Sequence, residues 1–216
     1  MTNATSDYPA YARSERIADG VIHALGVAFA MAGAVVITAF AALYADGWQA
    51  AAIGVYGAAL VATFVASACY HMTPWDGVRP TLRRIDHAAI YLKIAGTYTP
   101  LVVLIGSVYA YAVLTVVWAI AIAGAGAKMF FWRNPGRLGL MLYVALGWLS
   151  VLLLRPLHEA LPPGAVALVA AGGILYTAGV AFFAWDSLKF SNAIWHGFVL
   201  AASGCFFAAI AVGTFA

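Results

Sequence analysis

The chain has 216 residues, of which 65% are hydrophobic and only 9% charged, and its formal net charge is +3. This composition lies far outside that of water-soluble domains and indicates an integral membrane protein without a large soluble domain. So small a net charge gives no indication of nucleic-acid binding, and two cysteines within apolar runs do not predict a disulfide.

Seven apolar segments follow one another along the chain, each close to the ~20 residues that a bilayer-spanning helix needs. They cover roughly residues 18–44, 50–73, 84–106, 109–131, 137–155, 164–185 and 192–215. We therefore predict an all-α fold, a polytopic bundle of seven transmembrane helices that forms a single membrane domain over residues 1–216. Hydropathy separates the third and fourth segments least clearly, because only a short turn at Gly106 and Ser107 divides them.

Basic residues gather on one side of this topology, and cytoplasmic loops are enriched in Lys and Arg. The opposite side carries only Arg155. The N-terminal segment and the loops after the second, fourth and sixth segments carry Arg13, Arg16, Arg79, Arg83, Arg84, Lys128, Arg133, Arg137 and Lys189. We expect a cytoplasmic N-terminus in a multi-pass protein of the cell inner (plasma) membrane.

The first predicted helix begins with a stripe of ionisable side chains. Glu15, Asp19 and His23 are four residues apart and therefore share one helix face. Acidic residues are favourable at a helix N-terminus, which explains Glu15 well and Asp19 in part. This does not explain His23, about two turns deeper than Glu15. For Asp19 and His23, a role in a functional site therefore stays open as an alternative to the structural explanation.

The second predicted helix ends with Ser67 and His71, again four residues apart on one face. A serine at this spacing either orients the histidine ring, contacts a metal-bound water or bonds to its own backbone, and the last role is the more common for a lone helical serine. His71 is either a metal ligand or a histidine that faces lipid headgroups.

The third predicted helix opens with Asp86 and His87, which face different ways because they are neighbours. Only one of them is expected to point inward, and Asp86 alternatively pairs with an arginine just before it. Lys93 lies seven residues further on, about 10 Å deeper. A lysine at that depth needs a partner or water, and we expect pairing with Asp86 or Asp19.

The seventh predicted helix opens with Asn192 and His196, whose spacing of four gives a weak metal motif. Asn192 is alternatively a helix N-cap. Each of these signals is weak alone, yet they fall at one depth on four helices. Because polar groups are costly at the edge of hydrocarbon, this coincidence predicts a polar cluster near the cytoplasmic face.

These motifs resemble those of the haemolysin III family, the bacterial branch of the progestin and adiponectin receptor group. The matching stretches are Glu15–Gly26 (ERIADGVIHALG), Ser67–His71 (SACYH), Arg84–Pro100 (RIDHAAIYLKIAGTYTP) and Asn192–Leu200 (NAIWHGFVL). The resemblance covers nearly the whole chain, and the run IAGTYTP is its most specific part.

The resemblance implies an intramembrane zinc site near the cytoplasmic face. Its ligands correspond to His71, Asn192 and His196, with Ser67 and Asp86 nearby as catalytic residues. Since the wider relatives include alkaline ceramidases, it also implies hydrolysis of a lipid amide or ester. Zinc would polarise the carbonyl, and Asp86 would act as the base.

The sequence departs from the family pattern in three places. Asn192 replaces an expected histidine, Asp19 replaces a usual asparagine, and Lys93 stands at a usually apolar position. An amide oxygen is a poor zinc ligand, so the substitution at position 192 weakens the predicted site. A retained zinc would need Asp86, Asp19 or His23 to complete its ligands.

Two functions therefore stay open. The first is a zinc-dependent intramembrane hydrolase of a lipid amide or ester. The alternative is a non-catalytic regulator or sensor of lipid composition and membrane energetics, with a degenerate or absent metal site and a polar cluster that titrates near neutral pH. Membrane lipid is the expected partner in both, and the sequence names no protein partner. A pore-forming lysin is disfavoured, because no amphipathic insertion segment or secretion signal is present.

Overall fold

The computed structural model describes residues 11–131, 137–185 and 187–216, and within these ranges the regular structure is helical, without strands. Seven helices are long and apolar enough to cross a membrane, as predicted. In chain order, the elements are α1 (Arg13–Tyr44), α2 (Gly47–Met72), α3 (Arg79–Ile105), α4 (Val108–Gly126), the π-helical η1 (Ala127–Phe131), α5 (Arg137–Trp148), the 3-10 helix η2 (Leu149–Leu153), α6 (Leu154–Ala160), α7 (Pro163–Phe183) and α8 (Ser191–Phe215).

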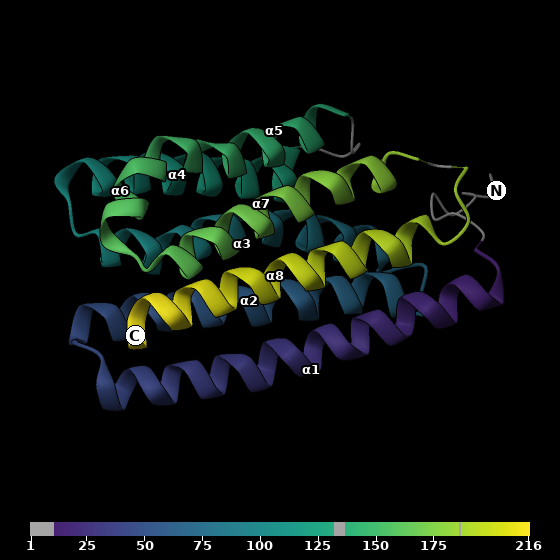
Figure 1. Ribbon diagram of the computed structural model, residues 1–216. Coiled ribbons are helices and arrows are strands. Elements are labelled where there is room, and N and C mark those ends of the chain that lie inside the picture. The colour runs from purple at the N-terminus through teal and green to yellow at the C-terminus, as the bar shows by residue number, and fades with distance from the viewer. Residues whose placement is uncertain (1–10, 132–136, 186) are drawn as a thin grey trace.

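The helices run alongside one another in a single bundle (Figure 1). α1 packs against α2 and α8, α3 packs against α2 and α4, and α7 packs against α8. Close approach needs small residues: a Cβ added to Gly96 of α3 would lie 2.7 Å from the Cβ of Ala59 on α2. Small residues at such crossings let helix backbones approach, which is how transmembrane helices gain packing energy in lipid.

The turn between α3 and α4 confirms the division expected at Gly106 and Ser107. Gly106 has a φ of 67°, a left-handed conformation that glycine adopts without strain, and it ends α3. Ser107 then caps α4, and its hydroxyl accepts a hydrogen bond from the Ala110 amide at 3.2 Å.

The fifth span runs to Ala160, five residues beyond its predicted end. Pro156 lacks an amide N–H, so the Leu152 carbonyl one turn earlier loses its usual helical donor. The helix narrows to 3-10 geometry over Leu149–Leu153, and the Tyr109 hydroxyl donates to the Leu152 carbonyl at 3.2 Å. This side-chain donor satisfies the carbonyl, as a membrane interior requires, and α6 continues past Arg155.

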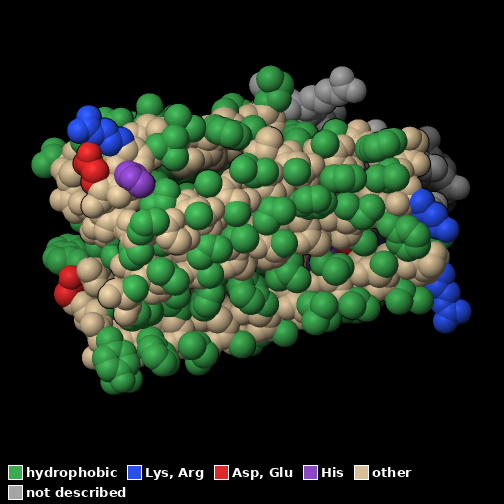
Figure 2. All heavy atoms as spheres, in the orientation of Figure 1, with side chains coloured by type: hydrophobic (Ala, Val, Ile, Leu, Met, Phe, Trp, Pro, Cys, Tyr) green, Lys and Arg blue, Asp and Glu red, His purple; other side chains and the backbone are tan. Residues whose placement is uncertain are grey.

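The surface between the two ends of the bundle is apolar. Figure 2 shows this for one face, where Lys and Arg side chains lie toward the two ends. Large side chains such as Val35, Ile122 and Ile174 are exposed along the spans. Such a surface is typical of contact with lipid hydrocarbon, and the chain is a multi-pass membrane protein.

Several basic residues that were expected in loops lie within helices, among them Arg79 and Arg83 at the start of α3. Lys128 belongs to η1 rather than to a loop; it is buried, and its Nζ lies 5.8 Å from the ring centroid of Tyr143. It therefore does not contribute to a loop charge that would set orientation. Arg133 and the side chain of Arg137 lie outside the described residues. The cytoplasmic placement of the N-terminus stays a prediction.

Candidate metal centre in a membrane cavity

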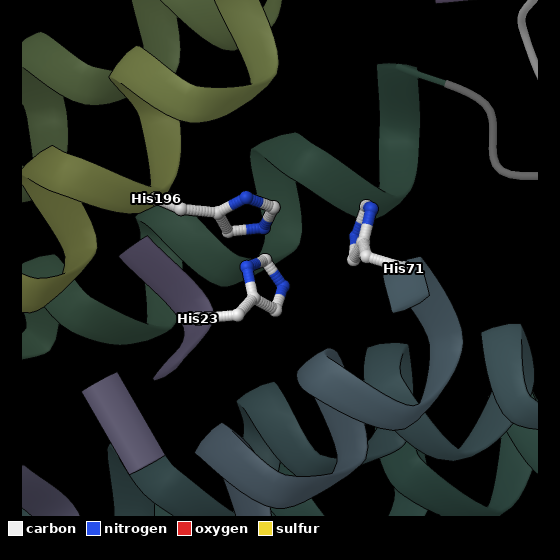
Figure 3. A group of neighbouring side chains, drawn as sticks. All are labelled: His23, His71 and His196. Carbon is white, nitrogen blue, oxygen red and sulfur yellow. The ribbon is translucent and has the colours of Figure 1, made fainter. Parts of the chain in front are cut away.

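Three imidazole rings from three different helices converge at the end of the bundle where α1 begins. His23 comes from α1, His71 from α2 and His196 from α8, and Figure 3 shows their rings facing one another. One nitrogen from each lies within 4.8 Å of the others. The ring centroids are 4.3 Å apart for His23 and His196, 4.6 Å for His71 and His196, and 5.1 Å for His23 and His71.

Asp19 lies beside this group, and its carboxylate orients one of the rings. Asp19 is buried, and its Oδ1 accepts a hydrogen bond from His196 Nδ1 at 2.7 Å. Its Oδ2 accepts from the Asn192 amide nitrogen at 2.9 Å. A proton held on Nδ1 leaves Nε2 of His196 as the free donor atom. This carboxylate–histidine pair is the arrangement that fixes a metal-ligating histidine in proteins.

A backbone contact fixes the same tautomer of His23, with the proton on Nδ1. Its Nδ1 lies 3.1 Å from the backbone oxygen of Asp19, one helical turn earlier. A carbonyl oxygen only accepts hydrogen bonds, so Nδ1 carries the proton and Nε2 is free. Nε2 lies 3.4 Å from the Ser67 hydroxyl. Ser67 thus contacts a ring on α1 rather than serving only its own helix, a partner that sequence spacing did not indicate.

Asn192 joins Asp19 to His71. It is the second residue of α8, and the N-cap position belongs to Phe190. The amide nitrogen of Asn192, besides its bond to Asp19, lies 3.2 Å from His71 Nδ1. An amide nitrogen that donates to a carboxylate is not a metal ligand. The structure therefore gives Asn192 a bridging hydrogen-bond role, and its predicted role as a ligand stays a prediction.

The three histidines fit the zinc that the family resemblance implies. Zinc binds imidazole nitrogens at about 2.0–2.1 Å, which puts tetrahedral ligands about 3.4 Å apart. Nitrogens that already lie within 4.8 Å need to approach by at most about 1.4 Å, which rotations of the side chains supply. Three histidines with one open position form a known type of catalytic zinc site. The group could hold a metal ion, in a set that uses His23 where the family pattern has a histidine at position 192.

Asp86 faces the same space from α3. It is buried, close enough to Ser67 to interact with its hydroxyl, and within electrostatic range of His196. No ion pair joins it to Arg83 or Arg84 in the part of the chain that the structure describes. Asp86 therefore lies with the histidines and Ser67, as the motif comparison implied, and the alternative of a local arginine pair is wrong.

Two residues of the predicted cluster lie outside the group of three histidines. Glu15 accepts hydrogen bonds from the Ala12 and Phe190 amides, each at 2.9 Å, and so fastens the start of α1 to the residue before α8. His87 is partly buried, and its backbone oxygen accepts from the Tyr143 hydroxyl at 3.1 Å. Both residues of the Asp-His pair line the cavity, and Asp86 is the one that interacts with the Ser67 hydroxyl.

Lys93 differs most from the sequence-based expectation. Among the described residues it forms no ion pair, so the predicted pairing with Asp86 or Asp19 is wrong. Its Nζ instead donates to the Ser203 hydroxyl at 2.7 Å. Sequence reasoning missed Ser203, although a signal was present: Ser203 lies seven residues after His196, as Lys93 lies seven after Asp86.

A large cavity connects these groups. Its volume is about 1210 Å³, above the range of about 300–1,000 Å³ that is usual for small-molecule pockets. The three histidines, Ser67 and Asp86 line one part, and Lys93 lines it deeper in the bundle. Beyond Lys93 the walls are mostly apolar and include Leu101, Leu153, Leu157, Val169 and Phe206.

Comparison with known proteins agrees with this arrangement. A family model described as haemolysin-III related matches residues 11–207. The chain is 34% identical over 195 residues to the hemolysin-3 homolog of Bacillus subtilis (strain 168), which covers 89% of this chain and 91% of that protein. It is also 34% identical over 194 residues to hemolysin-3 of Bacillus cereus, covering 89% of each.

A human protein shows a more distant likeness. The monocyte to macrophage differentiation factor of Homo sapiens is 27% identical over 175 residues, covering 76% of this chain and 71% of that protein. This supports the predicted tie to the progestin and adiponectin receptor group. The bacterial relatives are consistent with a place in the bacterial inner membrane. With a family match over most of its length, the chain belongs to the haemolysin-III related family.

Proposed function

We propose that this protein is a zinc-dependent hydrolase that cleaves a lipid amide or ester inside the membrane. One observation carries the proposal: three imidazoles from three helices converge on the wall of a large, mostly apolar cavity. A metal site in water-filled surroundings would suit many substrates. A site in a cavity of about 1210 Å³ whose deeper walls are mostly apolar suits the acyl chain of a lipid.

Access to this cavity from the bilayer supports a lipid substrate. Trp148 and Val151 of the fifth span and Ile174 of α7 line the cavity, and about half or more of each residue's surface is exposed. These residues lie in the middle of their spans, at the depth where an opening in the side of the bundle would meet hydrocarbon. An acyl chain can therefore enter between α7 and the fifth span without crossing water.

The protein's own residues have separate roles in this reaction. His23, His71 and His196 hold the metal, and Asp19 keeps His196 in the ligating orientation. When bound, zinc polarises a carbonyl oxygen and makes water ionise near neutral pH. Asp86 accepts the proton that water loses as its oxygen bonds to the carbonyl carbon. As the C–N or C–O bond breaks, Asp86 returns that proton to the leaving amine or alcohol, and Ser67 holds the carboxyl group in place.

A specific observation also favours the second candidate, a non-catalytic sensor. Both Asp19 oxygens accept hydrogen bonds from side chains of α8, so the cluster forms a connected polar network through Asn192 and His196. Such a network at the membrane edge links α1 to α8 through Asp19 and would couple a movement of one helix to the other. A sensor of this kind would not need to hydrolyse a substrate.

Metal content and turnover, measured on the same purified protein, separate the two candidates. The assay follows hydrolysis of a ceramide and of an ester phospholipid that carry the same fluorescent acyl chain. We expect about one zinc per chain, lost in His23→Ala and retained in His158→Ala, an exposed histidine in α6. We expect Asp86→Asn to keep zinc and lose turnover, by roughly 100-fold or more. Zinc binding without hydrolysis of either lipid would favour the sensor.

A further inference from the structure

Lys93 places a cation in the interior of a membrane bundle, and none of the acidic residues that the structure describes pairs with it. The side chain is buried, with 7% of its surface exposed. No ion pair reaches it within the described parts of the chain. A charged group at this depth is costly unless it is paired, and intramembrane ionisable residues are functional candidates for that reason.

The groups around Lys93 hold its ammonium in place without neutralising it. Nζ donates to Ser203 Oγ at 2.7 Å, and Ser203 donates to the Val199 carbonyl at 2.6 Å. Nζ also lies 4.8 Å from the ring centroid of Phe64 and 5.2 Å from that of Tyr176. Ring faces attract a cation but carry no net charge. An ammonium has three N–H donors, so those not bonded to Ser203 are available to a ligand.

The cavity offers the room for such a ligand. Lys93 and Tyr176 line it, and Lys93 lies seven residues from Asp86 along α3, about 10 Å deeper than the histidine group. The apolar walls continue past Lys93 to Leu101, eight residues and about 12 Å further on. A ligand whose charged end binds Lys93 can therefore place its tail in the apolar part of the cavity beyond this residue.

We propose that Lys93 anchors the carboxylate of a long-chain fatty acid whose tail occupies the apolar part of the cavity. A single carboxylate neutralises one ammonium and accepts its remaining N–H bonds. A phospholipid phosphate fits this position less well, because its glycerol and second chain would have to follow it about 10 Å below the level of the histidines. The site is separate from the metal centre and does not depend on the proposed hydrolysis.

The test uses 9,10-dibromostearate, which quenches tryptophan on contact, with the full-length protein in detergent. Trp148 lines the cavity and reports occupancy. The specific signal is the quenching that excess unbrominated stearate reverses. The methyl ester of the same brominated acid is the uncharged control ligand. We expect the acid to bind and the ester to bind at least about 10-fold more weakly, since a charge-assisted hydrogen bond is lost.

Variants locate the carboxylate. Lys93→Met keeps the length of the side chain and removes the charge, and we expect it to weaken binding of the acid by about 10-fold or more while leaving the ester unchanged. Lys128→Met removes the other buried lysine of the cavity wall and should bind like the unmodified protein. Ser203→Ala keeps the charge and should show a smaller loss. Circular dichroism and gel filtration check that each variant is folded.

The outcomes separate this site from the metal centre. Equal binding of acid and ester, or equal binding by Lys93→Met and the unmodified protein, would overturn the proposal. So would binding that is lost in His23→Ala and kept in Lys93→Met, because the carboxylate would then lie at the histidines. Loss in Lys93→Met with unchanged zinc content supports the site even if no lipid is hydrolysed.

Discussion

Asp19→Asn tests how far a carboxylate outside the ligand set controls the metal centre. The substitution keeps the size of the side chain and removes its charge. Asp19 Oδ1 lies 2.7 Å from His196 Nδ1, and its two oxygens lie 3.7 Å from His23 Nδ1 and 3.8 Å from His71 Nδ1. One carboxylate thus faces all three rings, within the range where its charge favours a bound cation.

The magnitude follows from these contacts. Loss of a hydrogen-bonded partner of a metal-ligating histidine lowers metal affinity by about 10–100-fold, or about 1.4–2.8 kcal/mol. An asparagine oxygen can still accept a hydrogen bond from His196. Loss of the charge-assisted hydrogen bond alone should therefore lower zinc affinity by about 10-fold, the lower end of that range. Because the charge near the other two rings is also lost, we expect a decrease of about 30-fold or more in zinc affinity.

Competition for zinc against a chromophoric chelator measures this affinity in purified protein. Glu15→Gln is the matched control, since Glu15 lies one turn away on the same helix face and, among the described residues, its carboxylate bonds to the Ala12 and Phe190 amides alone. It should leave zinc affinity unchanged. If Asp19→Asn binds zinc as tightly as the unmodified protein, Asp19 does not orient the ligands as argued.

Three further predictions follow from the same contacts. Zinc affinity should fall as the pH is lowered in a chelator titration, because protons compete with the metal for the imidazole nitrogens that bind it; an affinity that stays constant down to the pH at which the protein unfolds would exclude a histidine site. Asn192→His should raise zinc affinity by roughly 10-fold in that assay by adding an imidazole beside His71, and an unchanged affinity would mean that position 192 does not face the metal. Gly96→Ala should lower the thermal unfolding midpoint and the free energy of unfolding, the latter by about 1–3 kcal/mol, since the new Cβ would lie 2.7 Å from that of Ala59. Gly54→Ala is the control and should leave the midpoint unchanged, because a Cβ at Gly54 has open space around it.

Hydropathy was enough to predict the seven spans, because lipid demands long apolar helices with internally bonded backbones. It could not predict the extension of the fifth span past Arg155. Just before that extension, the Tyr109 hydroxyl donates to the Leu152 carbonyl, whose helical donor is missing at Pro156. A hydrogen bond between residues 43 positions apart leaves no local pattern in the sequence.

The sequence also predicted only part of the candidate site. Helical spacing placed Asp19 with His23, and Asn192 with His196, on common faces, and the structure has each pair together. Spacing within one helix could not show how helices rotate toward each other. Thus it missed the contact of Ser67 with His23, and it assigned Lys93 an acidic partner when its partner is Ser203.

The central claim is that His23 of α1, together with His71 and His196, holds a metal in a chain that has Asn192 where its family pattern has histidine. Zinc X-ray absorption of the loaded protein tests it most directly. We predict three imidazole nitrogens at about 2.0–2.1 Å in the unmodified protein and two in His23→Ala, with zinc bound more weakly. A spectrum that is the same in both proteins, or no zinc taken up by either, would contradict the account.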